Sequence, residues 1–223
     1  MCEVINIYIN VVDRRINPPK GLLPDTAILA TVLKNDRRVL ITVLPSEEGI
    51  RPLSEKIADL MESTTVKPDY YLRTDFKALE EIIDAIRGIE IHTEKNYKIG
   101  ETRYPKGLNK MGGHHAMALY KKSCETEEEM LAIRESVVEG LVRKALKGFS
   151  LTYDLPKLYS VAKKEVETNI DGAVIKKLAA KRTSADEKWH VIKQYMLEKD
   201  TEKERKSKIE KLKLFNIRLS LND

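Results

Sequence analysis

The chain has few of the residues that cross-link or anchor a protein. Its 223 residues include two cysteines, Cys2 and Cys124, which fit neither a disulfide scaffold nor a zinc site with closely spaced ligand pairs. The apolar runs reach about eight residues, far below the roughly 20 that span a bilayer, and no signal peptide pattern opens the sequence. We therefore expect either a cytosolic protein or one whose N-terminal membrane anchor is absent from this chain.

Aromatic residues are also scarce, at 6% with a single tryptophan, so we expect no nucleic-acid binding through base stacking. Charged residues are abundant at 34%, and the net charge is +5. This balance mildly favours anionic partners such as phosphates, acidic polymers or a membrane surface. The length suits one hydrophobic core, hence one domain with an appendage.

Three apolar segments near the N-terminus predict strands. Residues 4–12 alternate between apolar and polar side chains, whereas 27–33 and 38–44 are continuous β-branched runs joined by the turn "KNDR". Continuous runs are typical of central strands that are buried on both faces. Residues 27–44 therefore predict a hairpin whose two faces are covered by helices.

Several later segments have the apolar spacing of helices. We expect helices over 76–88, ending at Gly88, over 127–147, opened by Thr126 and Glu129, and over about 155–166 and 172–181, with one short helix between 46 and 68 and a strand at 89–92. Strands interleaved with helices predict an α/β fold of three layers, α-β-α, with a central mixed sheet, over residues 1–181. Residues 182–223 are dense in alternating charges and predict a helical C-terminal extension.

Two acids raise the question of a site. Asp13 ends the first predicted strand, and Asp25 stands at the entrance of the second, just behind Pro24. Aspartate is common in turns, where its carboxylate bonds the local backbone, so a structural role is the first interpretation. Two carboxylates brought close together would instead repel each other unless a cation lies between them.

The order of six blocks resembles the catalytic domain of the LytR-CpsA-Psr family, over roughly residues 4–180. These blocks are "INIYINVVD", "PDTAILATVL", "RVLITVLP", "DYYLRTDFKALEEIIDAIRGIEI", "YPKGLNKMGGHHAMALYKK" and "IRESVVEGLVRKAL". The resemblance implies an α-β-α domain on the extracytoplasmic face of the cell membrane. It also implies a phosphotransferase that moves glycopolymers from a polyprenyl pyrophosphate carrier onto peptidoglycan, with the lipid in an apolar channel.

The resemblance implies the site residues as well. Asp13 and Asp25 match two aspartates that hold Mg²⁺, which offsets charge on the pyrophosphate. The bases left to bind that group are Arg15, Lys121 and Arg134, together with loop bases such as Lys20, Arg103 and Lys106. Other positions of the family's arginine cluster differ in this sequence: they are Leu23, Ser46, Ser123 and Leu131, and Glu135 replaces a glutamine. The stretch between Pro45 and Asp69 is also shorter than in the family, which alters the channel mouth.

These departures leave three hypotheses. The first is a divergent member of this family, catalysing Mg²⁺-dependent transfer through Asp13, Asp25, Lys121 and Arg134, with activity weakened or lost because arginine binds phosphate bidentately and its replacements do not. The second is a non-catalytic binding or regulatory module for a polyprenyl or other anionic ligand. The third is a basic interaction domain that works through the C-terminal tail.

Other candidate residues favour structural roles. His114 and His115 are adjacent and so do not share a helix face, which indicates surface histidines. The glycines of "GLNKMGG" do not follow a predicted strand, as those of a phosphate-binding loop would. Cys124 precedes a predicted helix, and we interpret it as a plain small residue.

Overall fold

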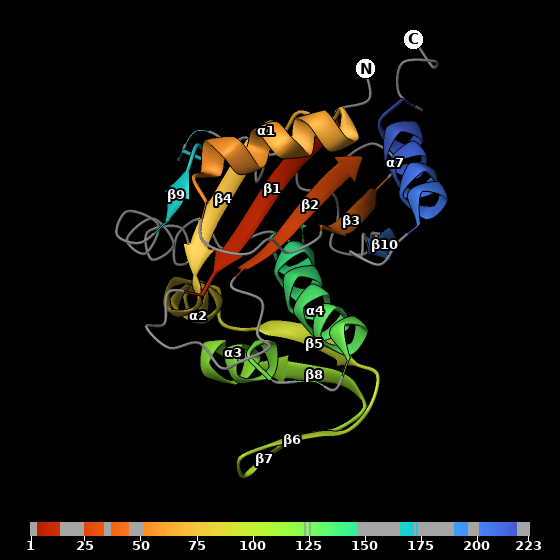
Figure 1. Ribbon diagram of the computed structural model, residues 1–223. Helices are drawn as coiled ribbons and strands as arrows, with labels where there is room; N and C mark the ends of the chain where they lie inside the picture. Colours follow the sequence, from red (N-terminus) through yellow and green to blue (C-terminus); the bar gives the residue numbers. More distant parts are fainter. Residues whose placement is uncertain are drawn as a thin grey trace.

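A six-stranded mixed sheet forms the centre of the molecule (Figure 1). This computed structural model describes residues 4–13, 25–33, 37–44, 51–122, 124, 126–146, 166–171, 173, 190–195 and 201–217. The strand order is β10-β3-β2-β1-β4-β9, and the strands are β1 (Val4–Val12), β2 (Asp25–Leu33), β3 (Arg38–Leu44), β4 (Tyr70–Asp75), β9 (Glu167–Thr168) and β10 (His190–Tyr195). Antiparallel pairing joins β1 to β2, β2 to β3 and β4 to β9, whereas β4 runs parallel to β1 and β10 parallel to β3.

Helices cover both faces of this sheet. On one face, α1 (Leu53–Thr64) and α7 (Glu202–Ile217) contribute Leu60 and Leu212 to a cluster with Tyr8 of β1. On the other face, α4 (Glu127–Leu146) packs Leu131 and Val138 against the first three strands. The apolar side chains of β2 and β3 are therefore buried from both sides, as their continuous β-branched composition predicts.

A smaller layer lies beyond α4 and positions the helices around the site. Here β5 (Ile89–Thr93) pairs with β8 (Gly107–Met111), and β6 (Tyr97–Ile99) pairs with β7 (Thr102–Tyr104) in a projecting hairpin (Figure 1). Helices α2 (Phe76–Ala85), α3 (Gly113–Tyr120) and α4 share one core cluster with β5 and β8. The approach of α4 to β5 is close, since a Cβ on Gly140 would stand 2.7 Å from the carbonyl oxygen of Glu90.

The predicted three-layer α-β-α fold with a central mixed sheet is confirmed. Strands β1, β2 and β3 and helices α1, α2 and α4 lie at the predicted places. Gly88, with φ of +82°, ends the turn after α2, and its N–H donates to the carbonyl of Ile83 at 2.8 Å. At the start of α4, the side chain of Thr126 accepts a hydrogen bond from the N–H of Glu129 at 3.2 Å. The helices predicted over 155–166 and 172–181 lie outside the described residues, apart from isolated positions at their ends.

The prediction of a helical segment directly after residue 181 is wrong for residues 190–195. These residues form β10, an edge strand parallel to β3, and the helix α7 follows it. The boundary near residue 181 stays a prediction, although β10 belongs to the same sheet as β1. Within the part of the chain that the structure describes, no helix is long and apolar enough to cross a membrane.

Candidate functional site

Three acids have their backbones at the same end of neighbouring central strands. In the register of the sheet, Val12 pairs with Asp25 of β2 and with Asp75 of β4, and Asp13 is the next residue of the chain. Asp13 is 5% exposed, so its carboxylate is largely shielded from water. The side chain of Asp25 and the whole of Arg15 lie outside the described residues. The main chain thus brings together the two aspartates that the resemblance paired.

Asp75 has a structural task at this end of the sheet. Its carboxylate accepts a hydrogen bond from the N–H of Ala78 at 2.9 Å and thereby caps the first turn of α2. The cap fixes the start of α2 beside Asp13. Phe76, the first residue of α2, is consequently held next to the strand ends.

Arg134 reaches the same strand ends from α4. The residue is 1% exposed, its Nη1 donates to Oγ1 of Thr26 at 2.8 Å, and its Cζ lies 5.3 Å from the centre of the Tyr120 ring. Thr26 follows Asp25 directly in β2, so the buried cation is anchored one residue from a candidate carboxylate. Nε and Nη2 of Arg134 have no hydrogen-bond partner among the described residues.

An aromatic pair links Arg134 to Lys121. The rings of Tyr120 and Phe76 meet edge to face with their centres 5.6 Å apart. Lys121, at the end of α3, places Nζ 5.3 Å from the centre of the Phe76 ring. The two candidate bases therefore lie on the two members of one aromatic pair, each in a cation–π contact. Contacts through Thr26, Tyr120 and Phe76 thus connect Arg134 and Lys121 to the strands that end at Asp25 and Asp75.

One described carboxylate, that of Asp13, bears on the Mg²⁺ that the family resemblance implies. Magnesium keeps several waters and needs one or two carboxylates, and Asp13 supplies a shielded carboxylate one residue beyond the Val12 and Asp25 pair. Among the described residues there is no cluster of three or more histidine, cysteine, aspartate or glutamate side chains. The described residues therefore do not form a metal site with three or more such protein ligands.

Two of the departures from the family pattern have a visible structural role. Leu131 packs in the core between α4 and the central sheet, and Glu135 is fully buried beside Arg134 in sequence. Leu23, Ser46 and Ser123 lie outside the described residues.

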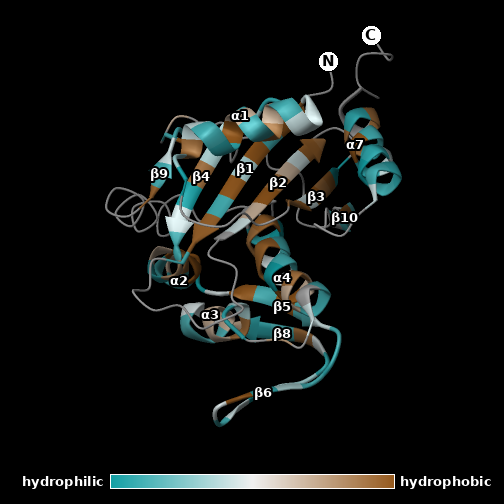
Figure 2. Ribbon diagram, viewed as in Figure 1, coloured by the Kyte–Doolittle hydropathy of each residue, from teal (hydrophilic) through white to brown (hydrophobic). Residues whose placement is uncertain are grey.

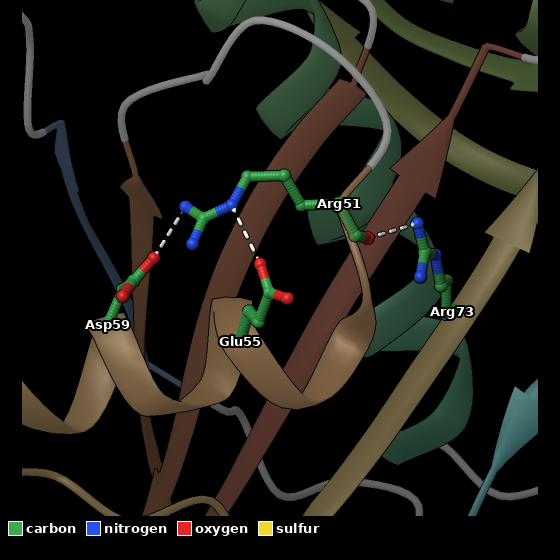
Figure 3. A network of polar contacts seen from close by, with 4 residues as sticks. All are labelled: Arg51, Glu55, Asp59 and Arg73. Carbon is green, nitrogen blue, oxygen red and sulfur yellow. Dashed lines mark hydrogen bonds and ion pairs between the residues drawn. The ribbon is translucent and has the colours of Figure 1, made fainter.

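Arg51 does not compensate for an arginine missing at position 46. It stands ahead of α1, and its guanidinium is held by Asp59 at 2.6 Å and Glu55 at 3.3 Å (Figure 3). Its carbonyl oxygen accepts a hydrogen bond at 2.8 Å from Arg73, whose Nη1 lies 3.9 Å from Glu167. Arg51 is thus already paired with two acids of α1. Arg103 and Lys106 belong to the β6–β8 segment instead of the strand ends.

A cavity of about 430 Å³ lies on a different face of α4 from Arg134. It is bounded by β5, the segment leading to β6, Leu119 of α3, and the residues Glu128, Glu129, Ala132, Ile133 and Ser136. None of Asp13, Lys121 and Arg134 lines it. The cavity is therefore separate from the candidate site.

The remaining candidates behave as the sequence predicts, with one correction. His114 and His115 are exposed on the first turn of α3. Gly112 and Gly113 do follow a strand, β8, contrary to the sequence interpretation. The N–H of Gly113 nevertheless donates to the carboxylate of Asp84 at 2.7 Å, so this helix start already holds an anion. Cys124 is half-buried, and burial raises the pKa of its thiol against the opposing effect of Lys122.

Sequence reasoning missed Thr26, Phe76 and Tyr120 as parts of the site. Each is an ordinary residue of a strand or helix, and its role depends on contacts between segments far apart, such as the bond from Arg134 to Thr26 across 108 positions. The adjacency of Thr26 to Asp25 is the one signal in the sequence. This adjacency points to the site only when the structure shows that Arg134 of α4 binds Thr26 of β2.

Comparison with known proteins agrees with this fold. Three solved structures illustrate the likeness. TagV of B. subtilis superposes with a TM-score of 0.69 at 14% identity, covering 98% of both chains. TagT bound to LI-WTA gives 0.68 at 11% identity, covering 95% of this chain and 90% of that one. A protein described as a transcriptional regulator from Enterococcus faecalis gives 0.66 at 19% identity, covering 87% and 76%. No curated protein matches the chain. The sequence model of the LytR_cpsA_psr family matches residues 35–218, and the chain therefore belongs to this family of proteins associated with the cell envelope.

Proposed function

We propose that the domain binds the pyrophosphate end of a polyprenyl-linked glycopolymer at the strand ends occupied by Asp13, Asp25, Lys121 and Arg134. The observation that carries the proposal is the state of Arg134. The residue is 1% exposed, so its guanidinium costs several kcal/mol to desolvate, and its Nε and Nη2 have no hydrogen-bond partner among the described residues. A phosphate group is a ligand whose two oxygens can accept two parallel hydrogen bonds from such a cation.

The neighbouring groups suit the same ligand. Lys121 adds a second positive charge, held over Phe76. Asp13 and Asp25 would hold Mg²⁺, which when bound offsets the negative charge that develops as the P–O–P bond of the pyrophosphate breaks. TagT, a structural neighbour, is described as bound to LI-WTA, which supports a glycopolymer as the carried group. We place the domain on the extracytoplasmic face of the membrane, where such a substrate is used.

If the domain transfers the glycopolymer, an acceptor hydroxyl attacks the phosphorus that bears the glycan. The P–O–P bond breaks, and polyprenyl monophosphate leaves while the hydroxyl proton passes to solvent or a base. Lys121 and Arg134 would hold the oxygens on which charge develops. We expect weaker transfer than in members with the full arginine cluster, because each charge-assisted contact is worth about 1.5 to 3 kcal/mol.

A non-catalytic binding module is the second candidate, and Glu135 favours it. This residue is fully buried and replaces the glutamine of the family pattern beside Arg134. An extra negative charge there would weaken transition-state stabilisation more than it weakens the burial of an apolar lipid chain. The two candidates share the ligand and differ in turnover.

The experiment measures binding and turnover on the same protein. The chain is titrated with farnesyl pyrophosphate and with farnesyl monophosphate, with and without Mg²⁺, and is then incubated with a polyprenyl pyrophosphate-linked glycan and a hydroxyl acceptor. We expect tighter binding of the pyrophosphate, strengthened by Mg²⁺, and slow release of polyprenyl monophosphate. Asp13→Asn should abolish the Mg²⁺ effect and the release.

Asp59→Asn is the matched control, because Asp59 is a half-buried carboxylate of α1 that is paired with Arg51. It should leave binding and release unchanged. Binding that depends on Arg134 without release of polyprenyl monophosphate would select the binding module. Equal affinity for pyrophosphate and monophosphate, unaffected by Asp13→Asn and by Arg134→Gln, would contradict both candidates.

A further inference from the structure

The cavity of about 430 Å³ beside α4 has an apolar wall. Ile91 of β5, Leu119 of α3 and Ile133 of α4 line it, and all three are buried in the core cluster that these elements share. Its volume lies in the range of small-molecule pockets, roughly 300 to 1,000 Å³. Because close-packed interiors leave few voids larger than a water molecule, a cavity of this size suits a ligand with an apolar body.

Charged side chains stand at the rim of this cavity, and most of them are acidic. Glu94, Glu128 and Glu129 line it, together with one lysine, Lys95. Glu94, Lys95 and Glu128 are exposed, which places the opening at the protein surface. A second lysine, Lys122, does not line the cavity but approaches Glu129 at 3.9 Å. The rim therefore has an excess of negative charge, although the whole chain has a net charge of +5.

A cation already lies at the rim, and the chain itself supplies it. Nζ of Lys95 is 2.8 Å from Oε1 of Glu129 and 5.7 Å from the centre of the Tyr97 ring. Glu129 and Tyr97 both line the cavity. A carboxylate next to the face of an aromatic ring attracts an ammonium group. We call Glu129 and Tyr97 the ammonium site.

The fold fixes the two residues of the ammonium site, whereas the side chain of Lys95 is exposed. Tyr97 is 8% exposed and belongs to the core cluster, and the side chain of Glu129 is 16% exposed in the first turn of α4. The side chain of Lys95 is 59% exposed. Water and salt screen an ion pair of this kind, so it contributes little to stability. Another ammonium group can therefore replace Nζ of Lys95 at a small cost.

Tyr97 belongs to both parts of the cavity. Its ring lies in the core cluster with Ile91 and Ile133, and the same ring forms part of the ammonium site. An apolar group that packs against the wall therefore brings an attached ammonium group next to Tyr97 and Glu129. Because this arrangement exists before a ligand binds, little has to be ordered on binding.

Two other classes of ligand fit this cavity less well. A small anion would meet the carboxylates of Glu94, Glu128 and Glu129 at the rim, and like charges repel. A metal ion would need several ligating side chains, and the described residues contain no group of three or more histidines, cysteines, aspartates or glutamates that could hold one. The apolar wall and the acidic rim together select a cation with an apolar body.

We propose that this cavity binds a small organic amine, whose apolar body packs against the wall and whose ammonium group contacts Glu129 and Tyr97 in place of Nζ of Lys95. The cavity is separate from the strand ends, since neither Asp13 nor Arg134 lines it. Amine binding should therefore be unchanged in Asp13→Asn.

The test uses the full chain and three probes that share one apolar body. The probes 4-phenylbutylamine, 4-phenylbutanol and 4-phenylbutyrate are titrated separately by ligand-observed NMR at pH 7.5, where the amine is protonated and the acid is ionised. We expect the amine to bind about tenfold or more tightly than the alcohol, since it gains a charge-assisted contact. The acid should bind no more tightly than the alcohol. Equal affinities for the amine and the alcohol, or no binding of the amine, would overturn the proposal.

Three variants locate the bound amine. Glu129→Gln should weaken amine binding about tenfold or more, and glutamine keeps the capping role of this helix position. Lys95→Gln should strengthen amine binding about threefold or more, because it removes the competing ammonium group. A damaged fold cannot produce this gain. Ala132→Leu places a larger side chain in the cavity and should weaken the binding of all three probes; unchanged binding would place the probes elsewhere and overturn the proposal.

The two charge variants have matched controls. Glu139→Gln removes a similarly buried acid of the same helix, which is paired with Arg143 and does not line the cavity. Lys98→Gln removes an exposed lysine three residues beyond Lys95 that does not line the cavity either. Both controls should bind the amine within about twofold of the wild type. If either control changed the affinity as much as its partner variant, the effect would be one of general charge, and the proposal would be overturned.

Discussion

Arg134 is the buried cation of the candidate site. Its side chain is buried, donates to Thr26 and lies against Tyr120, and two of its nitrogens have no hydrogen-bond partner among the described residues. A buried charge with incomplete partners is a cost to folding, and such costs are often kept because they serve binding. The residue should therefore behave differently in stability and in binding.

We predict that Arg134→Met separates these two properties. Methionine keeps much of the apolar stem and removes the desolvated charge, so the free energy of unfolding should change by less than about 1 kcal/mol or rise. Affinity for farnesyl pyrophosphate should fall by about tenfold or more, since one charge-assisted contact is lost. Urea unfolding and ligand titration measure the two effects.

Leu131→Ala is the comparison on the same helix. Leu131 is buried against the central sheet, and its truncation should cost roughly 2 to 5 kcal/mol. A loss of more than about 3 kcal/mol in Arg134→Met would contradict the prediction, because it would mean that the charge is already well paired in the free protein.

Cys124 gives a prediction about pH. Burial raises the pKa of its thiol, with a smaller contribution in the same direction from Glu129, while Lys122 lowers it. A raised pKa means less reactive thiolate at neutral pH. Alkylation by iodoacetamide, measured in a Cys2→Ser background, should be slower than that of free cysteine at pH 7.5. Its rate should keep rising above the pH at which free cysteine levels off, and a plateau at lower pH would contradict the assignment.

At the level of elements, α4 connects the candidate site to the rest of the fold. One face carries Arg134 and Leu131 toward the central sheet, and Gly140 lies against the carbonyl of Glu90 in β5. The helix therefore sits between two sheets. The distance between α4 and β5 therefore determines whether the side chain of Arg134 can reach Thr26.

Gly140→Ala tests whether packing or helix propensity dominates here. Propensity alone predicts a gain, because alanine stabilises a helix interior by roughly 0.5 to 1 kcal/mol over glycine. The new Cβ would instead stand 2.7 Å from the Glu90 carbonyl oxygen. We expect a net loss of about 1 to 3 kcal/mol, as in overpacked cores, and weaker pyrophosphate binding. Ser136→Ala on the same helix should change the unfolding free energy by about 0.5 kcal/mol or less.

The spacing of apolar residues correctly predicted the elements that have a clear apolar pattern of their own. Strands β2 and β3 are continuous β-branched runs, and α2 and α4 have apolar stripes with caps at Asp75 and Thr126. The pattern failed for β10, because the sequence around it spaces Trp189, Ile192 and Tyr195 as on a helix. Pairing with β3 supplies the hydrogen bonds of this edge strand, and no local pattern contains that partner.

The candidate site was predictable in its acids and less so in its surroundings. Asp13 and Asp25 could be chosen because they end neighbouring strands and match a known family pattern, and the register places their backbones together. Thr26, Phe76 and Tyr120 could not be chosen, because hydrogen bonds and ring contacts between distant segments define their roles. The function of the acids stays a prediction until binding is measured.

At the scale of the whole molecule, the C-terminal segment completes the central sheet. Strand β10 covers the edge of β3, whose residues Val39, Leu40 and Ile41 are fully buried, and Leu212 of α7 is fully buried in the cluster with α1. The outer side of α7 is hydrophilic (Figure 2). Residues 190–195 and 202–217 therefore have a structural role in the core, which their charged composition does not predict.

We predict that a chain ending at residue 181 does not keep the core stable. Removal of β10 and α7 would turn β3 into an open, apolar edge strand, which is a template for aggregation. It would also uncover the cluster around Leu212. Size-exclusion chromatography should show aggregates, and thermal melting should lose its cooperative transition. Leu212→Ala is the milder variant, expected to fold but to lose roughly 2 to 5 kcal/mol of unfolding free energy. A monomeric truncated chain with the melting temperature of the full chain would show that residues 182–223 are a dispensable appendage.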